Sequence, residues 1–306
     1  MTIASVAIIG LGLLGGSTGL AVQQFLPDLA TTGWDADPAT RARAATRGLV
    51  GTVCDTASEA VATADLVILC VPVGAMAEAA AAIAPALKPG ALVSDVGSSK
   101  QTVATALAEA LPGVTVIPAH PVAGTERSGP DAGFASLFQQ RWCIVTPPDG
   151  ADPVAVADLC ACWEALGARV EVMTPQHHDM VLAITSHLPH LIAYTIVGTA
   201  DDLEGVTQSE VIKYSAGGFR DFTRIAASDP TMWRDVFLTN KDAVLEMLGT
   251  FTEDLSKLTR AIRRGDGEAL FDHFTRTRAI RRGIVEIGQD SAAPDFGRPH
   301  EALKKS

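Results

Sequence analysis

A glycine-rich segment near the N-terminus constrains the fold of this chain more than any other feature. Gly10, Gly12 and Gly15 have the spacing G-x-G-x-x-G, between a short apolar run, Ser5–Ile9, and a helical stretch of small residues, 16–26. The first glycine permits a tight turn, the second lets a pyrophosphate reach backbone N–H groups, and the third lets the helix pack on the strand. The N-terminus of a helix favours an anion through its unpaired N–H groups and its dipole. The pattern predicts a dinucleotide-binding strand, turn and helix, with a flexible turn before an amphipathic helix as the alternative.

An aspartate follows at the distance expected for a ribose contact. Asp35 lies 20 residues beyond Gly15, after a second apolar run, 31–34. Its carboxylate can accept hydrogen bonds from ribose hydroxyls and would repel a 2′-phosphate, which favours NAD over NADP. Arg41 and Arg43, just beyond it, keep NADP open as the alternative. The predicted cofactor-binding residues are Gly10, Gly12, Leu13, Leu14, Gly15, Asp35, Val71 and Pro72.

The rest of the first half alternates apolar runs with Ala-rich helical stretches. The runs are 31–34, 66–71, 91–96, 114–118 and 142–145, and the helical stretches are 39–47, 75–86 and 100–111. This alternation predicts a mostly parallel sheet with helices on both faces. Val71 and Pro72 end one run at the carboxyl edge of that sheet, where ligands bind in doubly wound folds. A plain strand-ending proline is an equally good interpretation.

The pattern changes near residue 175. From 176 to 285 the apolar residues recur at helical spacing, for example over 232–248 and 251–262, and no convincing strand is found. Pro189 lies inside this pattern and is expected to kink or interrupt a helix. We predict an α/β chain with an N-terminal Rossmann-type domain, a doubly wound parallel sheet, over residues 1–175. An all-α domain would follow over 176–290, and a loose tail over 291–306.

Charge and cysteine content exclude several classes of protein. The 24 Lys and Arg against 35 Asp and Glu give a net charge of −11, which argues against a nucleic-acid partner. No basic residue precedes Arg41 and glycines break the first apolar stretch, so a signal peptide is not expected. No segment offers about 18 uninterrupted apolar residues, so no membrane span is expected. The five cysteines have neither CxxC nor zinc spacing, which favours reduced thiols in a cytoplasmic protein.

Four further segments carry polar groups in apolar or glycine-rich surroundings. They are 95–100 (DVGSSK), 120–126 (HPVAGTE), 186–190 (SHLPH) and 217–224 (GGFRDFTR). The first two follow predicted strands, so Ser98 and His120 are expected at the ligand-binding edge of the sheet. A histidine there suits an acid or base role in hydride transfer from an alcohol carbon, although a lone His-Pro pair is more often structural.

In this order, GLGLLGGS, DVGSSK, HPVAGTE, SHLPH and GGFRDFTRIAASDPTMWRD resemble the prephenate/arogenate (cyclohexadienyl) dehydrogenase family of tyrosine biosynthesis. The resemblance implies oxidative decarboxylation of prephenate to 4-hydroxyphenylpyruvate, and of arogenate to tyrosine, with hydride transfer to NAD. It also implies a homodimer formed through the helical domain, which would share in binding this small-molecule substrate. The alternatives are an NADP-linked, arogenate-specific enzyme, another two-domain Rossmann dehydrogenase, and a nucleotide sensor without catalysis.

The resemblance also implies roles for individual residues. His120 matches the catalytic histidine, which must be neutral to accept a hydrogen bond from the C4 hydroxyl of the substrate, and Ser98 matches the serine that orients this hydroxyl. Arg224 matches the arginine that binds a substrate carboxylate, a role that suits its planar guanidinium. The other residues expected around the substrate are Thr125, Glu126, Ser186, His187, His190 and Trp233.

The remaining histidines of the helical half have simpler interpretations. His187 and His190, together with the 177–179 segment, could suggest a metal site. No ligand motif joins them and hydride transfer requires no metal, so no metal is predicted. His177 and His178 are expected to be solvated groups at the N-terminal end of a helix.

Overall fold

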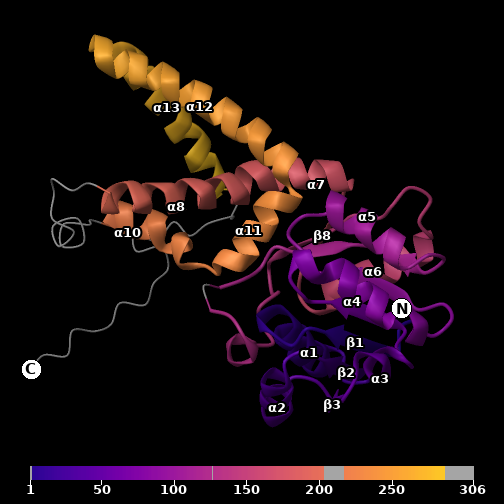
Figure 1. Ribbon diagram of the computed structural model, residues 1–306. Coiled ribbons are helices and arrows are strands. Elements are labelled where there is room, and N and C mark those ends of the chain that lie inside the picture. The colour runs from indigo at the N-terminus through magenta and orange to yellow at the C-terminus, as the bar shows by residue number, and fades with distance from the viewer. Residues whose placement is uncertain (1, 126, 203–216, 287–306) are drawn as a thin grey trace, which may run out of the picture. The chain divides into compact units, whose positions relative to one another are not determined.

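The computed structural model describes residues 2–125, 127–202 and 217–286 (Figure 1). Contacts divide the chain into two compact units, Met1–Met247 and Leu248–Ser306. The first unit contains both sheets and most of the helices. The second contains the larger part of one long helix and the helix that follows it.

The first unit is built on a six-stranded sheet in which every pairing is parallel. The spatial order of the strands is β3-β2-β1-β4-β5-β6. This order is typical of Rossmann folds, in which ligands bind beyond the carboxyl ends of the central strands, where the order reverses. The strands are β1 (Ser5–Ile9), β2 (Ala30–Trp34), β3 (Thr52–Val53), β4 (Leu66–Leu69), β5 (Leu92–Asp95) and β6 (Thr115–Val116).

Helices cover both faces of this sheet, as the sequence predicts (Figure 1). Val6 and Ile8 of β1 belong to the core on one face, and Ala7 and Ile9 to the core on the other. Side chains alternate between faces along a strand, so a strand buried on both faces is a continuous apolar run. The first core includes α1 (Leu13–Phe25), α2 (Pro38–Arg47) and α6 (Pro153–Ala165), and the second α3 (Ala57–Val61), α4 (Met76–Ile83) and α5 (Gln101–Ala110).

Three strands form a second sheet that the sequence does not predict. They are β7 (Ala119–Pro121), β8 (Trp142–Val145) and β9 (Arg169–Val172), with β7 antiparallel and β9 parallel to β8. The predicted strand 114–118 ends early, at Val116, and Pro118 lies between β6 and β7. Proline cannot donate to a ladder, so a strand stops or changes sheet at such a residue. His120 is therefore part of β7 and lies one sheet away from the position expected.

After residue 174 the described chain contains only helices and the turns between them. The predicted helix 232–248 is wrong in one respect, because it is two helices that meet at Asn240. Pro189 has the expected effect, since a π-helical turn, Ala183–His187, directly precedes its helix. The elements are α7 (Pro175–Leu182), the π turn, α8 (Leu188–Asp201), α10 (Gly217–Thr223), α11 (Pro230–Thr239), α12 (Lys241–Arg264) and α13 (Gly267–Glu286). Short 3-10 helices span Val73–Ala75, Ala84–Ala86, Pro130–Ala132 and Arg224–Ala227.

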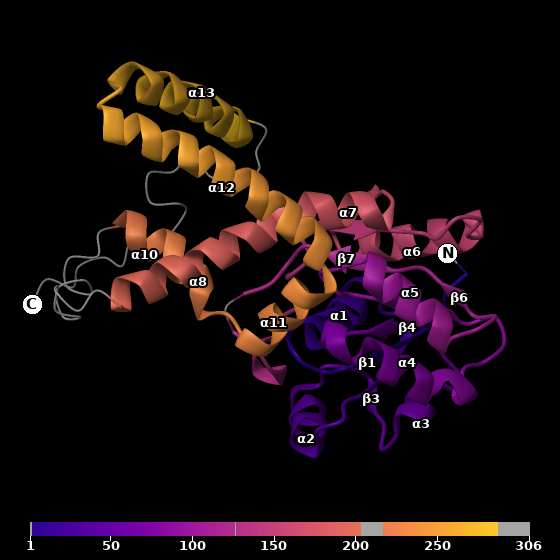
Figure 2. The same cartoon turned by 45° about the horizontal axis from the view of Figure 1, so that its top comes forward.

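The second unit is an antiparallel pair of helices, the larger part of α12 and α13, lying side by side (Figure 2). Gly265 ends α12 with a φ of +66°, a backbone conformation that glycine adopts without strain. The pKa of the Asp254 carboxyl in α12 is lowered mainly by its hydrogen bond with Lys257. Arg276 and His273 of α13 lower it further through electrostatic attraction. Electrostatic attraction therefore links the two helices at a point away from the turn.

One helical stretch is long and apolar enough to cross a membrane by length and composition alone. It is Pro175–Asp201, with a mean hydropathy of 1.5. The sequence criterion of uninterrupted apolar residues did not select this stretch, because His187 and His190 interrupt it. His178 and Asp179 of the same stretch are buried and bonded to residues of other elements, as in a helix packed within a protein.

Candidate active site

The three glycines of the first turn are required for different reasons. A Cβ atom on Gly10, whose φ is +97°, would lie 2.8 Å from the backbone of Cys70, and one on Gly15 would lie 1.8 Å from the carbonyl oxygen of Gly10. A Cβ on Gly12 would meet no atom within 4 Å, and Gly12 is the N-cap of α1 without a side-chain cap. The fold thus requires Gly10 and Gly15, whereas Gly12 leaves open space beside unpaired N–H groups. That arrangement fits the pyrophosphate of a dinucleotide.

Asp35 lies at the end of β2 beside this turn, as predicted. Its Oδ2 accepts from the N–H of Leu11 at 2.7 Å and its Oδ1 from the N–H of Asp37 at 3.0 Å. Arg41 donates to the carbonyl of Asp35 at 2.7 Å, and Arg43 forms an ion pair with Asp131 at 2.6 Å. The Asp35 carboxylate is therefore held in a position to bind a ribose. The contacts described for Arg41 and Arg43 are made with other groups of the protein.

The other predicted cofactor residues surround the same turn. Leu13 and Leu14 begin α1 and are half-buried. Val71 and Pro72 follow β4, and the backbone of Val71 lies 3.1 Å from the Cβ position of Gly10. The structure thus brings all the predicted cofactor residues to the carboxyl edge of the central strands.

A buried ion pair joins this sheet to β7. The ammonium of Lys100, which is completely buried, donates to Asp95 at the end of β5 and to the carbonyl of Ala119 at 2.7 Å. Burial lowers the pKa of Lys100, and the neighbouring Asp95 opposes that shift. Asp95 also accepts from the N–H groups of Gly97 and Ala119. Because Ala119 directly precedes His120, the pair fixes the backbone that carries His120.

His120 lies in a row of buried polar side chains. Its Nδ1 is 2.8 Å from Nε2 of His178, and Nδ1 of His178 is 2.8 Å from Oδ1 of Asp179. The two Asp179 oxygens also accept from the N–H groups of Lys100 and Gln101, at 2.7 and 2.9 Å. Asp179 therefore caps the N-terminus of α5 and at the same time anchors His178.

His187 lies near this row and is held by a different residue. The amide Nδ2 of Asn240 donates to the carbonyl of Asp179 at 2.8 Å and lies 3.0 Å from Nδ1 of His187. An amide nitrogen only donates, so Nδ1 of His187 accepts and its proton is on Nε2. The backbone of Ser98 lies near the ring, but Nε2 makes no hydrogen bond of normal geometry among the described residues. A buried N–H without a partner is available to a ligand.

Burial keeps these rings neutral. Desolvation lowers the pKa of His120 well below its usual value of 6.5, and the charges of His178, Lys100 and His187 act in the same direction. Desolvation also lowers the pKa of His187 to about 4, and it lowers that of His178 despite the bond to Asp179. A neutral His120 meets the requirement of a hydrogen-bond acceptor.

The predicted substrate residues fall into two groups. His190 stacks on Trp233, with ring centroids 3.6 Å apart, and its Nδ1 donates to the carbonyl of Ser186 at 2.9 Å. The rings of Trp233 and His187 pack edge to face, with their centroids 6.0 Å apart. Arg224 is exposed, and its charge lowers the pKa of His190, after desolvation as the main cause. These five residues are brought together by the helical segment.

The remaining predicted residues lie outside this cluster, although the backbone of Ser98 lies near the ring of His187. Ser98 is half-buried after β5, as expected from the sequence. Thr125 is exposed, and its hydroxyl bonds with the backbone of Arg127. Glu126 lies outside the described residues.

One prediction at this site is wrong. His177 is exposed as expected, but His178 is completely buried. Sequence reasoning also missed Asp179 and Asn240. The burial of His178 and Asp179 could have been predicted from the sequence. Positions 178, 179, 182 and 183 lie on one face of a helix, and residues 182 and 183 are Leu and Ala. No comparable signal marks Asn240.

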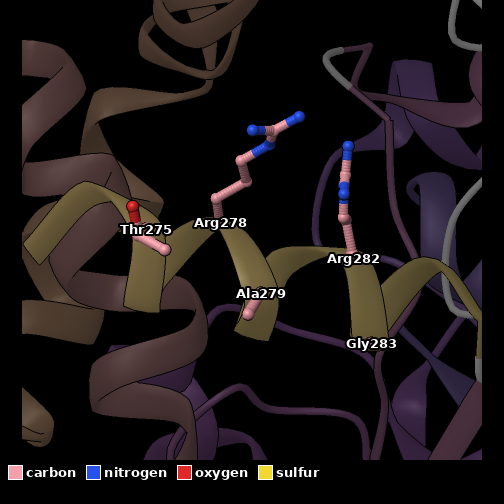
Figure 3. Close-up of a pocket in the computed structure, with 5 residues that line it drawn as sticks. All are labelled: Thr275, Arg278, Ala279, Arg282 and Gly283. Carbon is pink, nitrogen blue, oxygen red and sulfur yellow. The ribbon is translucent and has the colours of Figure 1, made fainter. Parts of the chain in front are cut away.

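Figure 3 shows a pocket on α13, lined by Thr275, Arg278, Ala279, Arg282 and Gly283. All five residues belong to one helix. One face of a single helix cannot enclose a ligand, so this pocket is not the candidate site.

The cofactor turn, Asp35 and the neutral His120 define a nicotinamide-dependent dehydrogenase with a Rossmann fold and a helical second half. Family models agree with this class. The model described as "Prephenate dehydrogenase, nucleotide-binding domain" matches residues 18–172, and "Prephenate dehydrogenase, dimerization domain" matches residues 174–276. The chain belongs to the prephenate dehydrogenase family.

Individual relatives support the same conclusion. The cyclohexadienyl dehydrogenase of Zymomonas mobilis is 45% identical over 279 residues, which cover 91% of this chain and 95% of the relative. The crystal structure of Aquifex aeolicus prephenate dehydrogenase with hydroxyphenyl propionate and NAD+ is 32% identical, with a TM-score of 0.86 over 93% of this chain and 99% of that one. Synechocystis arogenate dehydrogenase is 26% identical, with a TM-score of 0.78 over 91% of this chain and 99% of that one.

Proposed function

We propose that this protein oxidises prephenate to 4-hydroxyphenylpyruvate with loss of CO2, using NAD, and that arogenate is a second substrate that yields tyrosine. The observation that carries the proposal is a buried, neutral His120 in a chain whose glycine turn leaves open space for a dinucleotide at Gly12. The kinship with cyclohexadienyl and arogenate dehydrogenases supports both substrates.

The chemistry needs a hydrogen-bond acceptor at the C4 hydroxyl while hydride leaves C4. His120 is that acceptor in our proposal, and Ser98 orients the same hydroxyl. Bound NAD supplies the hydride acceptor. Arg224 binds a substrate carboxylate, with His187, His190, Ser186 and Trp233 around the substrate. Thr125 and Glu126 complete the proposed entrance.

The cofactor turn and the substrate residues suggest a division of labour along the chain. We propose residues 1–175 as the NAD-binding domain and 176–290 as the helical domain for substrate and dimerisation. The predicted tail, 291–306, lies outside the described residues. The family ranges that meet between 172 and 174 support a boundary there.

NAD is the cofactor that Asp35 favours. Its carboxylate stands where a 2′-phosphate would come, and a like charge repels that group. Arg41 and Arg43 are engaged with a backbone carbonyl and with Asp131. The alternative, an NADP-linked enzyme specific for arogenate, would place a 2′-phosphate against the carboxylate of Asp35.

We further propose a cytoplasmic homodimer formed through the helical domain. The name of the matched dimerization domain supports this assembly. So do exposed apolar side chains on its helices, among them Ile196 and Val197 of α8 and Phe271 and Phe274 of α13.

The test is an assay of purified protein with prephenate and arogenate, each with NAD and NADP. Formation of reduced nicotinamide is expected fastest with NAD. The His120→Asn variant should bind NAD normally and lose about 10²- to 10⁴-fold in kcat, the range of general acid–base catalysis. An inactive wild-type protein on both substrates would exclude the proposed function, and a fully active variant would remove His120 from its role.

A further inference from the structure

We propose that His178 and Asp179 are positioning residues that hold His120 in a single tautomer, with the proton on Nδ1 and a free lone pair on Nε2. The proposal deepens the proposed function and rests on it, because it concerns the group that receives the hydroxyl proton. It concerns His178, which the sequence predicted to be solvated, and Asp179, to which the sequence assigned no role.

The tautomer follows from the order of donors and acceptors. A carboxylate only accepts, so His178 donates from Nδ1 to Asp179 across 2.8 Å. A neutral His178 then has only a lone pair on Nε2. His120 must therefore donate from Nδ1 across the 2.8 Å that separates the two rings. The Nε2 atom of His120 is left as the acceptor.

The row cannot easily adopt the opposite order. The Asp179 residue is 3% exposed, and its carboxylate also receives two N–H groups at the start of α5. Its backbone carbonyl receives the Asn240 amide. Rotation of the carboxylate would leave the buried donors of Lys100, Gln101 and His178 without their acceptor. The anchor of the row is thus fixed by α5 and by Asn240.

This arrangement leaves Nε2 of His120 able to accept the proton that the C4 hydroxyl loses during the reaction. As the C4–H bond breaks and its electron pair leaves as hydride, the hydroxyl proton passes to Nε2 of His120. The Nδ1–H of His120 keeps its bond to His178, which orients the imidazolium. When the bond to the leaving CO2 breaks, its electrons complete the aromatic ring and the phenolate oxygen recovers the proton. His120 ends as it began.

The groups facing His120 explain why an orienting partner is needed. They are His178 from α7, His187 from the π turn and Lys100 before α5, and all three disfavour a charged His120. Of the carboxylates, Asp179 reaches it through His178, and Asp95 acts on Lys100. A row ending in a carboxylate offsets part of the penalty, as the buried aspartate does for the histidine of serine proteases.

The first experiment reads the tautomer directly and needs no substrate. Nitrogen-15 spectra of protein labelled at histidine distinguish a proton on Nδ1 from one on Nε2, and the His120→Asn variant identifies the His120 signals. We expect His120 protonated on Nδ1 and unprotonated on Nε2 at neutral pH. A proton on Nε2, or exchange between both forms, would overturn the proposal.

The second experiment uses His178 variants. His178→Phe keeps a ring of similar size without an acceptor and should lower kcat about 10²-fold or more, with the KM values of NAD and prephenate within about threefold. His178→Gln can offer an amide oxygen to Nδ1 of His120 and should recover at least tenfold of that loss. Equal losses in both variants, or a loss confined to KM, would contradict a positioning role.

His177→Phe is the matched control, because His177 is the neighbouring histidine and is exposed. It should leave kcat unchanged. If the wild-type protein turns over neither prephenate nor arogenate, the proposed function fails, whereas the spectra still decide the tautomer. If His178→Phe does not fold, the spectra of the wild-type protein and the Gln variant carry the test.

Discussion

At the scale of single residues, the glycine motif separates what the fold needs from what a ligand needs. Gly15 is required because its α1 backbone lies against the Gly10 carbonyl, and no side chain fits there. Gly12 faces open space, and its φ of −74° suits any residue. A consensus spacing does not reveal this difference, since all three positions carry the same letter. The contacts of a hypothetical Cβ reveal it.

The first prediction follows from that difference. Gly12→Ala places a methyl group in the space proposed for the pyrophosphate, so the Kd for NAD should rise at least tenfold, about 1.4 kcal/mol. Its effect on stability should stay below about 1 kcal/mol, the scale of a helix cap. Gly15→Ala should instead destabilise the fold by about 3 kcal/mol or more, because a backbone oxygen cannot move aside. Calorimetric titration with NAD and thermal melting measure the two effects. Unchanged NAD affinity in Gly12→Ala would speak against the proposed phosphate site.

At the scale of elements, the stretch from α7 to α8 carries most of the buried histidines. His178 and His187 face inward, and His190 stacks on Trp233. Burying neutral histidines links stability to pH. The folded pKa of His187 is about 4 against 6.5 for an ordinary histidine. Between pH 6.5 and pH 4 the unfolded chain therefore binds a proton at His187 that the folded chain does not bind. The free energy of unfolding falls as the pH is lowered through this range.

We expect the free energy of unfolding to be constant with respect to His187 above pH 6.5 and to fall by about 3 kcal/mol toward pH 4. His120 and His178, whose pKa values are also lowered, add to the same trend. Urea unfolding at a series of pH values measures it. His187→Gln removes one titrating group and should flatten the slope, whereas His177→Gln, on the exposed side, should not. Equal slopes in the two variants would show that His187 contributes no such linkage.

Sequence patterns predict a helix or strand well where its own residues are apolar enough to indicate burial. The bounds of β1 and β8 agree with the predicted runs, because these strands are apolar. The missed strands β3 and β7 have two and three residues, too few for a pattern. The exposed, charged β9 was also missed.

The site residues also divide into those that local sequence patterns predict and those that they do not. Ser98 and the glycine turn follow predicted strands and were found where expected. His178 and Asp179 become buried only because α7 packs near the start of α5, which lies about 80 residues earlier in the chain. Asn240 was hidden inside a predicted helix, and the structure shows that its side chain joins Asp179 to His187 at a helix break. The helix face of His178 and Asp179 signals burial, but the distant segments that these residues contact leave no local pattern.

At the scale of the whole molecule, the net charge of −11 and the anionic ligands are compatible, because the charge acts locally. Backbone N–H groups at the start of α1 can receive phosphates without any basic side chain. The same scale shows an excess of apolar surface. On α13, Phe271 is 69% exposed, Phe274 56% and Ile280 57%. Aromatic side chains with this exposure fit the interface of the proposed dimer.

The dimer can be tested on this helix. Phe271 and Phe274 are three residues apart and share one face of α13, so replacing both with Asp puts two charges into any interface formed there. The double variant should elute at the mass of a single chain, 31.9 kDa, where the wild-type protein elutes at twice that mass. Light scattering during gel filtration, over a range of concentrations, gives the masses. The side chains are exposed in the isolated chain, so the substitutions should cost little monomer stability. Val154→Asp, at a 61% exposed position on α6, is the matched control and should remain dimeric. A wild-type protein that is monomeric at every concentration would exclude the homodimer, and a dimeric double variant would move the interface away from this face of α13.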